Sequence, residues 1–222
     1  VYRAINVHVP EGTWLNPRPP APVAASSMPT NATVLNAITY ALVQAVPEKV
    51  THIMPHLILP PHVHGVDPRS GQWYVNGNRD FYAGGAGAVH GIDGWAGCYP
   101  LSAGIYFSPI EMIEVDFPCL TIRNEYVINT GGAGFWRGMP GNAIERKVVG
   151  HTAHGSAYLW GNRYPPKGLL GGEDGSLSSF SMKYGSKDEV KVDTWVQNVG
   201  LLPGESYFIQ SAGGPGFGDP LE

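Results

Sequence analysis

Hydrophobic side chains predict one amphipathic helix near the start of the chain. Between residues 31 and 46 they recur at spacings of three and four, which places them along one stripe of a helix. Thr30 or Asn31 can cap its start, and Pro47 ends it. We therefore expect one clear helix at about residues 31–46 that packs against a sheet or a partner. Its apolar stripe consists of Val34, Leu35, Ile38, Leu42, Ala45 and Val46.

The preceding residues lack this pattern and are predicted to form an extended, proline-rich arm over residues 1–30. Val7, His8 and Val9 make a short strand-like run. The prolines that follow disfavour a helix and favour polyproline or turn conformations. They are Pro10, Pro17, Pro19, Pro20 and Pro22.

Beyond Thr51 the apolar pattern changes to short runs of β-branched and aromatic residues bounded by Gly, Pro, Asn and Asp. Such runs predict strands, and no later segment predicts a helix of comparable quality. The expected fold class is therefore α+β and β-rich, with Gly-rich turns. The runs are Gln72–Val75, Met112–Val115, Thr121–Ile128, Ala157–Trp160, Val190–Val196 and Tyr207–Gln210.

Glycine and proline are both nearly doubled. The 222 residues include 30 Gly and 20 Pro, where average usage gives about 16 and 11. A phosphate-binding loop or a dinucleotide-binding turn would open a helix, which these glycines do not precede. Turns and close backbone packing are therefore the favoured explanation. The glycine clusters lie at 84–87, 131–134, 171–175 and 213–218.

Charged residues make up only 14% of the chain, and the net charge is -4. No basic surplus is present for a nucleic acid, and no apolar run is long enough to span a membrane. The 43% apolar content is too high for a disordered chain. We expect much of the surface to be covered by a partner or a missing domain. A compact, charge-poor β protein is the alternative.

The chain begins at Val1 without a recognisable signal peptide, which predicts a processed or truncated piece of a longer protein. Cys98 and Cys119 do not make a disulfide framework. We expect free, partly buried thiols and a cytoplasmic location.

Histidines supply one candidate for metal binding. If Pro61–His64 is extended, His62 and His64 project from the same face of a strand, and Asp67 could add an oxygen ligand. His151 and His154 form a second, looser pair. Surface or hydrogen-bonding histidines are the alternative for both pairs.

Carboxylates suited to acid–base chemistry are few. Asp93, Glu111, Glu114 and Asp116 stand in apolar surroundings, although a salt bridge or a helix cap would explain each as well. The sequence has no Gly-x-Ser-x-Gly nucleophile turn.

An ordered series of motifs resembles the C-terminal part of the hydantoinase B/5-oxoprolinase family, which includes the large subunits of acetone and acetophenone carboxylases. Each motif is weak alone, but the series runs over nearly the whole chain in register. The motifs are Pro10–Pro17, Pro19–Val23, Gly84–Ala88, Asp93–Gly94, Pro109–Glu111, Gly131–Gly138, Pro165–Gly172 and Gly213–Leu221.

This resemblance implies that residues 1–222 are one C-terminal segment of a larger hydantoinase B-type subunit. It implies as partners the remaining N-terminal part of that subunit and a hydantoinase A-type subunit that binds ATP and Mg. Phosphorylation then activates a carbonyl of a small-molecule substrate, for hydrolysis of a cyclic amide or for carboxylation of a ketone. A divalent metal such as Mn or Zn would lie outside this segment. No nucleic acid or membrane partner is expected.

The motifs mark Asp93, Glu111 and Arg137 as candidate catalytic residues, with His62 and His64 as metal candidates. The sequence departs from the family where hydrolase-like members carry a His-rich run and this chain has Cys98–Ser108. The departure favours the carboxylase branch slightly over hydrolysis of a hydantoin, lactam or 5-oxoproline. A third interpretation is a non-catalytic scaffold that docks subunits.

Overall fold

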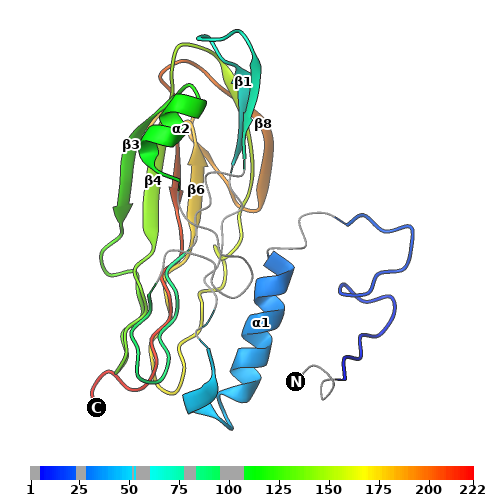
Figure 1. Cartoon of the computed structure of the whole chain (residues 1–222), viewed down its shortest axis with the longest axis vertical. Helices are drawn as coiled ribbons and strands as arrows, with labels where there is room; N and C mark the ends of the chain where they lie inside the picture. The colour runs from blue at the N-terminus through cyan, green and yellow to red at the C-terminus, as the bar shows by residue number, and fades with distance from the viewer. Residues whose placement is uncertain (1–5, 24–28, 52, 54–60, 78–83, 96–107) are drawn as a thin grey trace.

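The computed structural model describes residues 6–23, 29–51, 53, 61–77, 84–95 and 108–222. Within these residues the body consists of two antiparallel β-sheets and few helical residues (Figure 1). The expected β-rich α+β class is confirmed. Cys119 is half-buried, as expected, and is not part of a disulfide within the described residues, whereas Cys98 lies outside them.

The smaller sheet has four strands in the order β2-β1-β5-β8, and the larger has five in the order β3-β4-β9-β6-β7. The smaller sheet contains β1 (His62–Val66), β2 (Trp73–Asn76), β5 (Ala153–Tyr158) and β8 (Trp195–Leu201). The larger contains β3 (Cys119–Tyr126), β4 (Asn142–Val148), β6 (Ser179–Met182), β7 (Val190–Lys191) and β9 (Ser206–Gln210).

Three of the six predicted strand runs coincide with these strands. The runs at 72–75, 121–128 and 207–210 correspond to β2, β3 and β9. The run at 157–160 overlaps only the end of β5, and the run at 190–196 is divided between β7 and β8. Val7–Val9 form no strand, because these residues have no neighbouring strand to pair with among the described residues.

The main hydrophobic core lies between the two sheets. Alternate residues of each strand face inward, and Gly155 of β5 lets the sheets approach closely. A Cβ atom on Gly155 would lie 2.5 Å from Cε of Met182 in the opposite sheet. The core therefore leaves one face of each sheet pointing outward. Its fully buried members include Val63, Ala153, Ala157 and Leu201 from one sheet and Ile144, Val148, Phe180, Met182, Tyr207 and Ile209 from the other.

Helix α1 (Pro29–Leu42) confirms the predicted helix but ends at Leu42 instead of Val46. Pro47 disfavours helical backbone at the residue before it, and Val46 has φ −140°. The chain therefore leaves the helix before Pro47, through a tight turn in which Ala45 N–H donates to Leu42 O. A short 3-10 turn, η2 (Pro47–Lys49), follows.

The buried stripe of α1 differs from the predicted one. Ile38 and Leu42 are half exposed, at 50% and 48%. The helix turns a neighbouring stripe inward, where Val43 packs against Leu169 and Phe217. The Tyr40 hydroxyl also accepts a hydrogen bond from Lys167 N–H at 2.9 Å. The predicted stripe is therefore only partly covered by the body, because Val34 and Leu35 are half-buried whereas Ile38 and Leu42 face away from it. The stripe that is buried consists of Ala32, Asn36, Thr39 and Val43.

A second helix, α2 (Ile110–Asp116), lies where a strand was predicted at Met112–Val115. Only Ile113 of this helix is buried. Over so few residues an apolar run cannot distinguish helix from strand, so packing decides. The Glu114 carboxylate fixes the end of the helix to β3 by accepting the Thr121 N–H at 2.7 Å.

Beyond one end of the sheets, four glycine-rich segments at 84–94, 130–141, 166–176 and 211–218 run side by side and form what we call the glycine bundle. Backbone hydrogen bonds join them: Gly132 N–H donates to Gly214 O, Met139 N–H to Ala86 O and Gly216 N–H to Glu173 O. Helix α1 lies along one side of this bundle (Figure 1).

Close packing explains these glycines, as predicted. A Cβ on Gly138 would lie 1.9 Å from Gly214 O, and a Cβ on Gly214 would lie 1.9 Å from Ala86 O. Real Cβ atoms cannot approach an oxygen so closely, so the three segments require glycine at their contacts. No helix opens directly after these clusters in the described residues.

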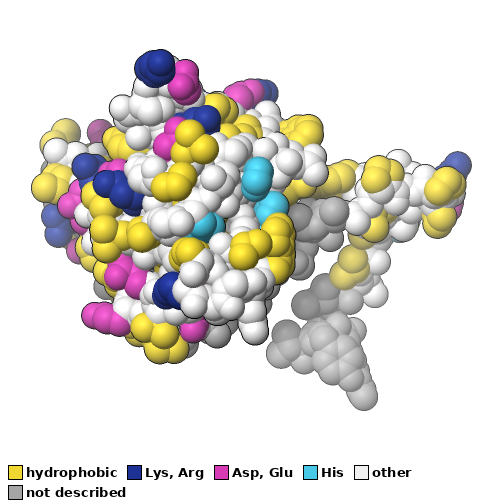
Figure 2. Space-filling view, turned by 90° about the horizontal axis from the view of Figure 1, so that it is seen from above, with side chains coloured by type: hydrophobic (Ala, Val, Ile, Leu, Met, Phe, Trp, Pro, Cys, Tyr) yellow, Lys and Arg dark blue, Asp and Glu magenta, His cyan; other side chains and the backbone are white. Residues whose placement is uncertain are grey.

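Residues 6–23 form an arm that stands apart from the body, as Figures 1 and 2 show. An isolated bridge between Thr13 and Asn16 is the only β-pairing within these described residues. Trp14 is 70% exposed. The extended arm over the full range 1–30 stays a prediction, because residues 1–5 and 24–28 lie outside the described residues.

Candidate functional site

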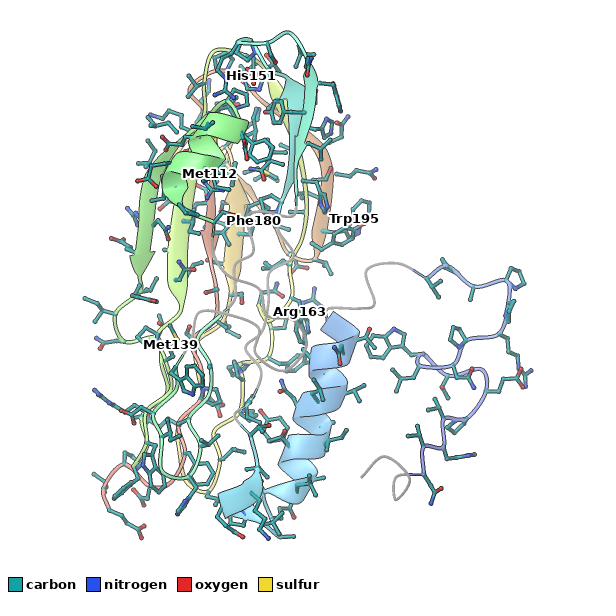
Figure 3. The ribbon with its side chains drawn as sticks, viewed as in Figure 1. Met112, Met139, His151, Arg163, Phe180 and Trp195 are labelled. Atoms are coloured by element: carbon teal, nitrogen blue, oxygen red, sulfur yellow. The ribbon has the colours of Figure 1, made fainter. Side chains whose placement is uncertain are left out.

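A cavity of about 410 Å³ opens in the wall of the glycine bundle. Two of the three predicted catalytic residues, Asp93 and Arg137, line it together, and Figure 3 labels Met139 at the same place. The volume is in the range of small-molecule sites. The other lining residues are Gly94, Asn129, Gly131, Gly132, Ala133, Gly138 and Pro140.

A two-way backbone clamp holds Asp93 and Arg137 beside each other. The Asp93 carboxylate accepts the backbone N–H of Arg137 at 2.8 Å, and Gly94 N–H donates to Arg137 O at 2.7 Å. The Arg137 guanidinium also lies 3.8 Å from the second oxygen of Asp93. The two segments therefore present an acid and a base from fixed backbone positions.

Both charged groups remain largely accessible to a ligand. The Arg137 side chain is 77% exposed and that of Asp93 is 54% exposed. An ion pair this exposed contributes little to stability. The pair is thus better suited to meeting a ligand than to holding the bundle together.

Aromatic rings support the Arg137 segment from behind. Trp136 lies between His90 and Phe217, with ring centroids 4.8 and 5.6 Å away. Its backbone also pairs with that of Phe217. This packing fixes the backbone from which the Arg137 side chain projects.

Three backbone N–H groups of the wall are used for hydrogen bonds inside the bundle. Gly132 and Gly138 donate their N–H groups to Gly214 O and Gly132 O, and Met139 donates to Ala86 O. These three donors are therefore not available to a bound anion, whereas the Asp93 and Arg137 side chains are accessible.

The Arg137 and Asp93 side chains can recognise a small polar molecule that has both a hydrogen-bond donor and an acceptor. The Arg137 guanidinium can donate to a carbonyl or phosphate oxygen, and the Asp93 carboxylate can accept an N–H. A guanidinium can also stabilise an oxyanion, and a carboxylate can act as a general base. An amide offers both complementary groups in one plane.

Asn129 is a lining residue that sequence reasoning missed. It has a positive φ of 60°, which asparagine tolerates better than most residues. Its position two residues before the glycine cluster at 131–134 was the available signal.

Glu111 does not join this site. It is an exposed residue in the first turn of α2, at the end of the body away from the glycine bundle (Figure 1). Motif order placed Glu111 near Asp93 in the sequence, but the sheets separate the two in space. Its catalytic role stays a prediction.

His62 and His64 lie on one face of β1, as the alternation of a strand requires. His64 is opposite His154 on β5, and their rings stack with centroids 5.7 Å apart. Burial lowers the pKa of His64, and the nearby His154 and His62 lower it further. Buried Nδ1 of His64 has no hydrogen-bond partner in the part of the chain that the structure describes.

Asp67 is not available as a third ligand. Its carboxylate makes a bidentate pair with Arg69, whose hydrogen bonds hold the pKa of Asp67 below its usual value. Within the described ranges, no group of three potential ligands is positioned to hold a metal ion. Metal binding by His62 and His64 stays a prediction.

His151 is separated from His154 and joins a different contact. Its Nδ1 lies 2.9 Å from Val149 O, and its Nε2 lies 2.8 Å from the Tyr74 hydroxyl, within hydrogen-bond distance of each. Burial raises the pKa of Tyr74. The contact ties the β1–β2 hairpin to the loop before β5.

The motifs and the bundle define a class of protein. The chain belongs to the hydantoinase B/oxoprolinase family, whose model matches residues 1–220. The beta subunit of the caprolactamase of Pseudomonas jessenii is 31% identical over 100% of this chain and 39% of its own length. The B-type subunit of the putative D-/L-hydantoinase of Pseudomonas sp. (strain NS671) is 31% identical over 99% of this chain and 36% of its own.

Solved structures agree with this assignment. The ATP-dependent caprolactamase from Pseudomonas jessenii matches with a TM-score of 0.82 and 26% identity over 99% of this chain and 39% of that chain. A nucleotide-free acetone carboxylase matches with a TM-score of 0.63 and 16% identity over 85% of this chain and 29% of that chain, which shows the fold alone. The chain spans about two fifths of the length of the curated relatives above.

Among the described helices, none is both long and apolar enough to cross a membrane.

Proposed function

We propose that this chain is part of a hydantoinase B-type subunit in an ATP-dependent enzyme complex that hydrolyses a cyclic amide. One observation carries the proposal: two relatives at 31% identity, aligned over essentially the whole chain, are named for a caprolactam and for hydantoins. The solved caprolactamase is described as ATP-dependent, which supports ATP as the co-substrate.

The complex is proposed to include the remaining N-terminal part of this subunit and a hydantoinase A-type partner that binds ATP and Mg. The length of the relatives supports the first, and the designation of the caprolactamase relative as a beta subunit supports the second. Phosphorylation of the amide carbonyl oxygen would turn a poor electrophile into one that water can attack. A divalent metal such as Mn or Zn is proposed to bind outside this 222-residue segment.

The proposed role of the Asp93–Arg137 pocket is to bind and orient the amide. Arg137 would donate to the carbonyl oxygen or to the phosphoryl group on it, and Asp93 would accept the ring N–H. The backbone clamp at 2.7 and 2.8 Å fixes the spacing between the two groups. Orientation of this kind contributes to catalysis by reducing the entropy lost on reaching the transition state.

Ketone carboxylation is the second candidate. The replacement of the family's His-rich run by Cys98–Ser108 favours it, although these residues lie largely outside the described ones. The third candidate is a scaffold that only docks subunits.

One assay separates hydrolysis from carboxylation, and alanine variants in the same assay test the scaffold. The full complex is incubated with ATP and labelled bicarbonate, and it is offered a caprolactam-type lactam, hydantoin, acetone or acetophenone. Ring opening that needs ATP but no bicarbonate supports the proposal. Label fixed only with a ketone would establish carboxylation instead. Unchanged turnover after alanine replacement of Asp93, Glu111 and Arg137 would favour the scaffold.

A further inference from the structure

The two sheets present outward faces of opposite character. The four strands of the smaller sheet contain no Lys, Arg, Asp or Glu. The larger sheet carries charged residues on its outward face, where Arg123 is opposite Glu145, and Lys147 follows on β4. The outer face of the larger sheet is therefore suited to contact with water. The strands of the smaller sheet offer no charged side chain that would favour such contact.

Large apolar side chains occupy the uncharged face from one corner to the other. Trp73 on β2 is opposite Val66 on β1, and Tyr158 on β5 is opposite Trp195 on β8. Val75 stands beside His64 between these pairs. Each of the five apolar side chains is at least half exposed. An uncharged face that exposes several large apolar side chains is typical of an interface in soluble proteins.

The histidines belong to this face too. His64 contacts the Trp73 ring at 5.1 Å and the His154 ring at 5.7 Å, and burial favours its neutral form. In Figure 2 the histidine side chains lie among hydrophobic and uncharged ones, while charged side chains gather mainly on the side of the body away from the arm.

We propose that the outer face of the β2-β1-β5-β8 sheet is covered by the remaining part of the same subunit. This inference rests on the proposed function's assignment of the chain to a longer hydantoinase B-type subunit. The relatives leave about 60% of their own length unmatched by this chain, a portion longer than the chain itself. An intramolecular interface is permanent, and permanent interfaces are the ones most depleted in charge.

The position of the face agrees with this occupant. Trp195 projects from β8 on the side of the two-sheet body where α1 and the arm lie (Figure 3). On α1, Ile38 and Leu42 are also half exposed. A single further domain could therefore contact both the sheet and the helix. A separate, exchangeable subunit would instead be expected to use the charged face, where ion pairs can set specificity.

Hydroxyl-radical footprinting of the full-length subunit in its complex tests coverage. Trp73, Tyr158 and Trp195 should lose most of their labelling relative to Tyr126, which is 62% exposed on β3 of the larger sheet and serves as the matched control. Labelling of the three residues as strong as that of Tyr126 would overturn the proposal. Neither result depends on turnover, so a complex inactive on lactams can still support it.

A photo-crosslinker at Tyr158 identifies the occupant, with a second at Leu120 on the charged sheet as control. The expected product is a crosslink within one polypeptide, to residues outside this 222-residue chain. A crosslink to the ATP-binding subunit or to a second copy of the chain would overturn the assignment. Because Tyr158 is half exposed, its replacement should leave the fold intact.

Discussion

Asp93 and Arg137 show how much of a site depends on tertiary packing. They are 44 positions apart and meet because two segments of the glycine bundle run side by side. Sequence motifs marked both residues, but no local pattern could show that they share a cavity. The same reasoning also marked Glu111, which the fold places elsewhere. Residue identity was predictable here, and proximity was not.

Replacing Arg137 with alanine should impair catalysis without unfolding the protein. We expect kcat/KM of the full complex for a cyclic amide to fall about tenfold to a hundredfold, as for loss of a charge-assisted hydrogen bond of about 1.5–3 kcal/mol. The unfolding free energy should change by less than about 0.5 kcal/mol, because the side chain is exposed. Steady-state kinetics and thermal unfolding measure the two effects.

Arg163→Ala is the matched control for that variant. Arg163 also pairs with an aspartate, Asp193, and its side chain is similarly exposed, but it does not line the cavity. Its kinetics should stay near the wild-type values. Equal losses in both variants would assign the Arg137 effect to general surface charge instead of the pocket.

His64 should make the subunit less stable at acidic pH. Burial lowers its folded-state pKa, so below about pH 6.5, the ordinary value for histidine, the unfolded chain binds more protons than the folded chain. Stability therefore falls as the pH decreases through this range. His64→Gln should reduce the fall in Tm between pH 7 and lower values, as followed by circular dichroism. An unchanged pH profile would show that His64 protonates freely in the folded state.

At the scale of elements, the sequence predicted those helices and strands whose apolar residues follow a clear local periodicity. The helix near residue 31 and the strands β2, β3 and β9 follow from apolar spacing and bounding turns. Helix α2 was missed because seven residues carry too little periodicity to distinguish helix from strand. The rotated stripe of α1 was missed because tertiary contacts, including Tyr40 with Lys167, determine its orientation.

Gly138→Ala should destabilise the glycine bundle. The new Cβ would lie 1.9 Å from Gly214 O, so two backbones would have to separate. We expect a loss of at least about 2 kcal/mol, at the upper end of overpacking costs. Chemical denaturation of the full-length subunit measures it.

Gly200→Ala provides the comparison for Gly138→Ala. Gly200 lies on β8, has no positive φ, and a Cβ there would meet nothing within 4 Å. This variant should be nearly neutral in denaturation. If both variants were neutral, the close approach of the bundle segments would not require glycine.

At the scale of the whole molecule, the structure shows where charged residues are lacking. The sequence showed only that 14% of residues are charged. The structure concentrates the deficit on the smaller sheet, while the larger sheet keeps its charged residues. The TM-score of 0.82 to the caprolactamase shows that a similar fold occurs within a longer chain. A surface of this kind fits a segment built to be partly covered.

We propose that this chain takes part in the ATP-driven opening of a cyclic amide. The most direct test is the amount of ADP released per amide ring opened by the full complex in the absence of bicarbonate. We predict equimolar ADP and ring-opened product, and no product without ATP. Ring opening at the same rate without ATP, or ADP release that requires a ketone and bicarbonate, would contradict the account.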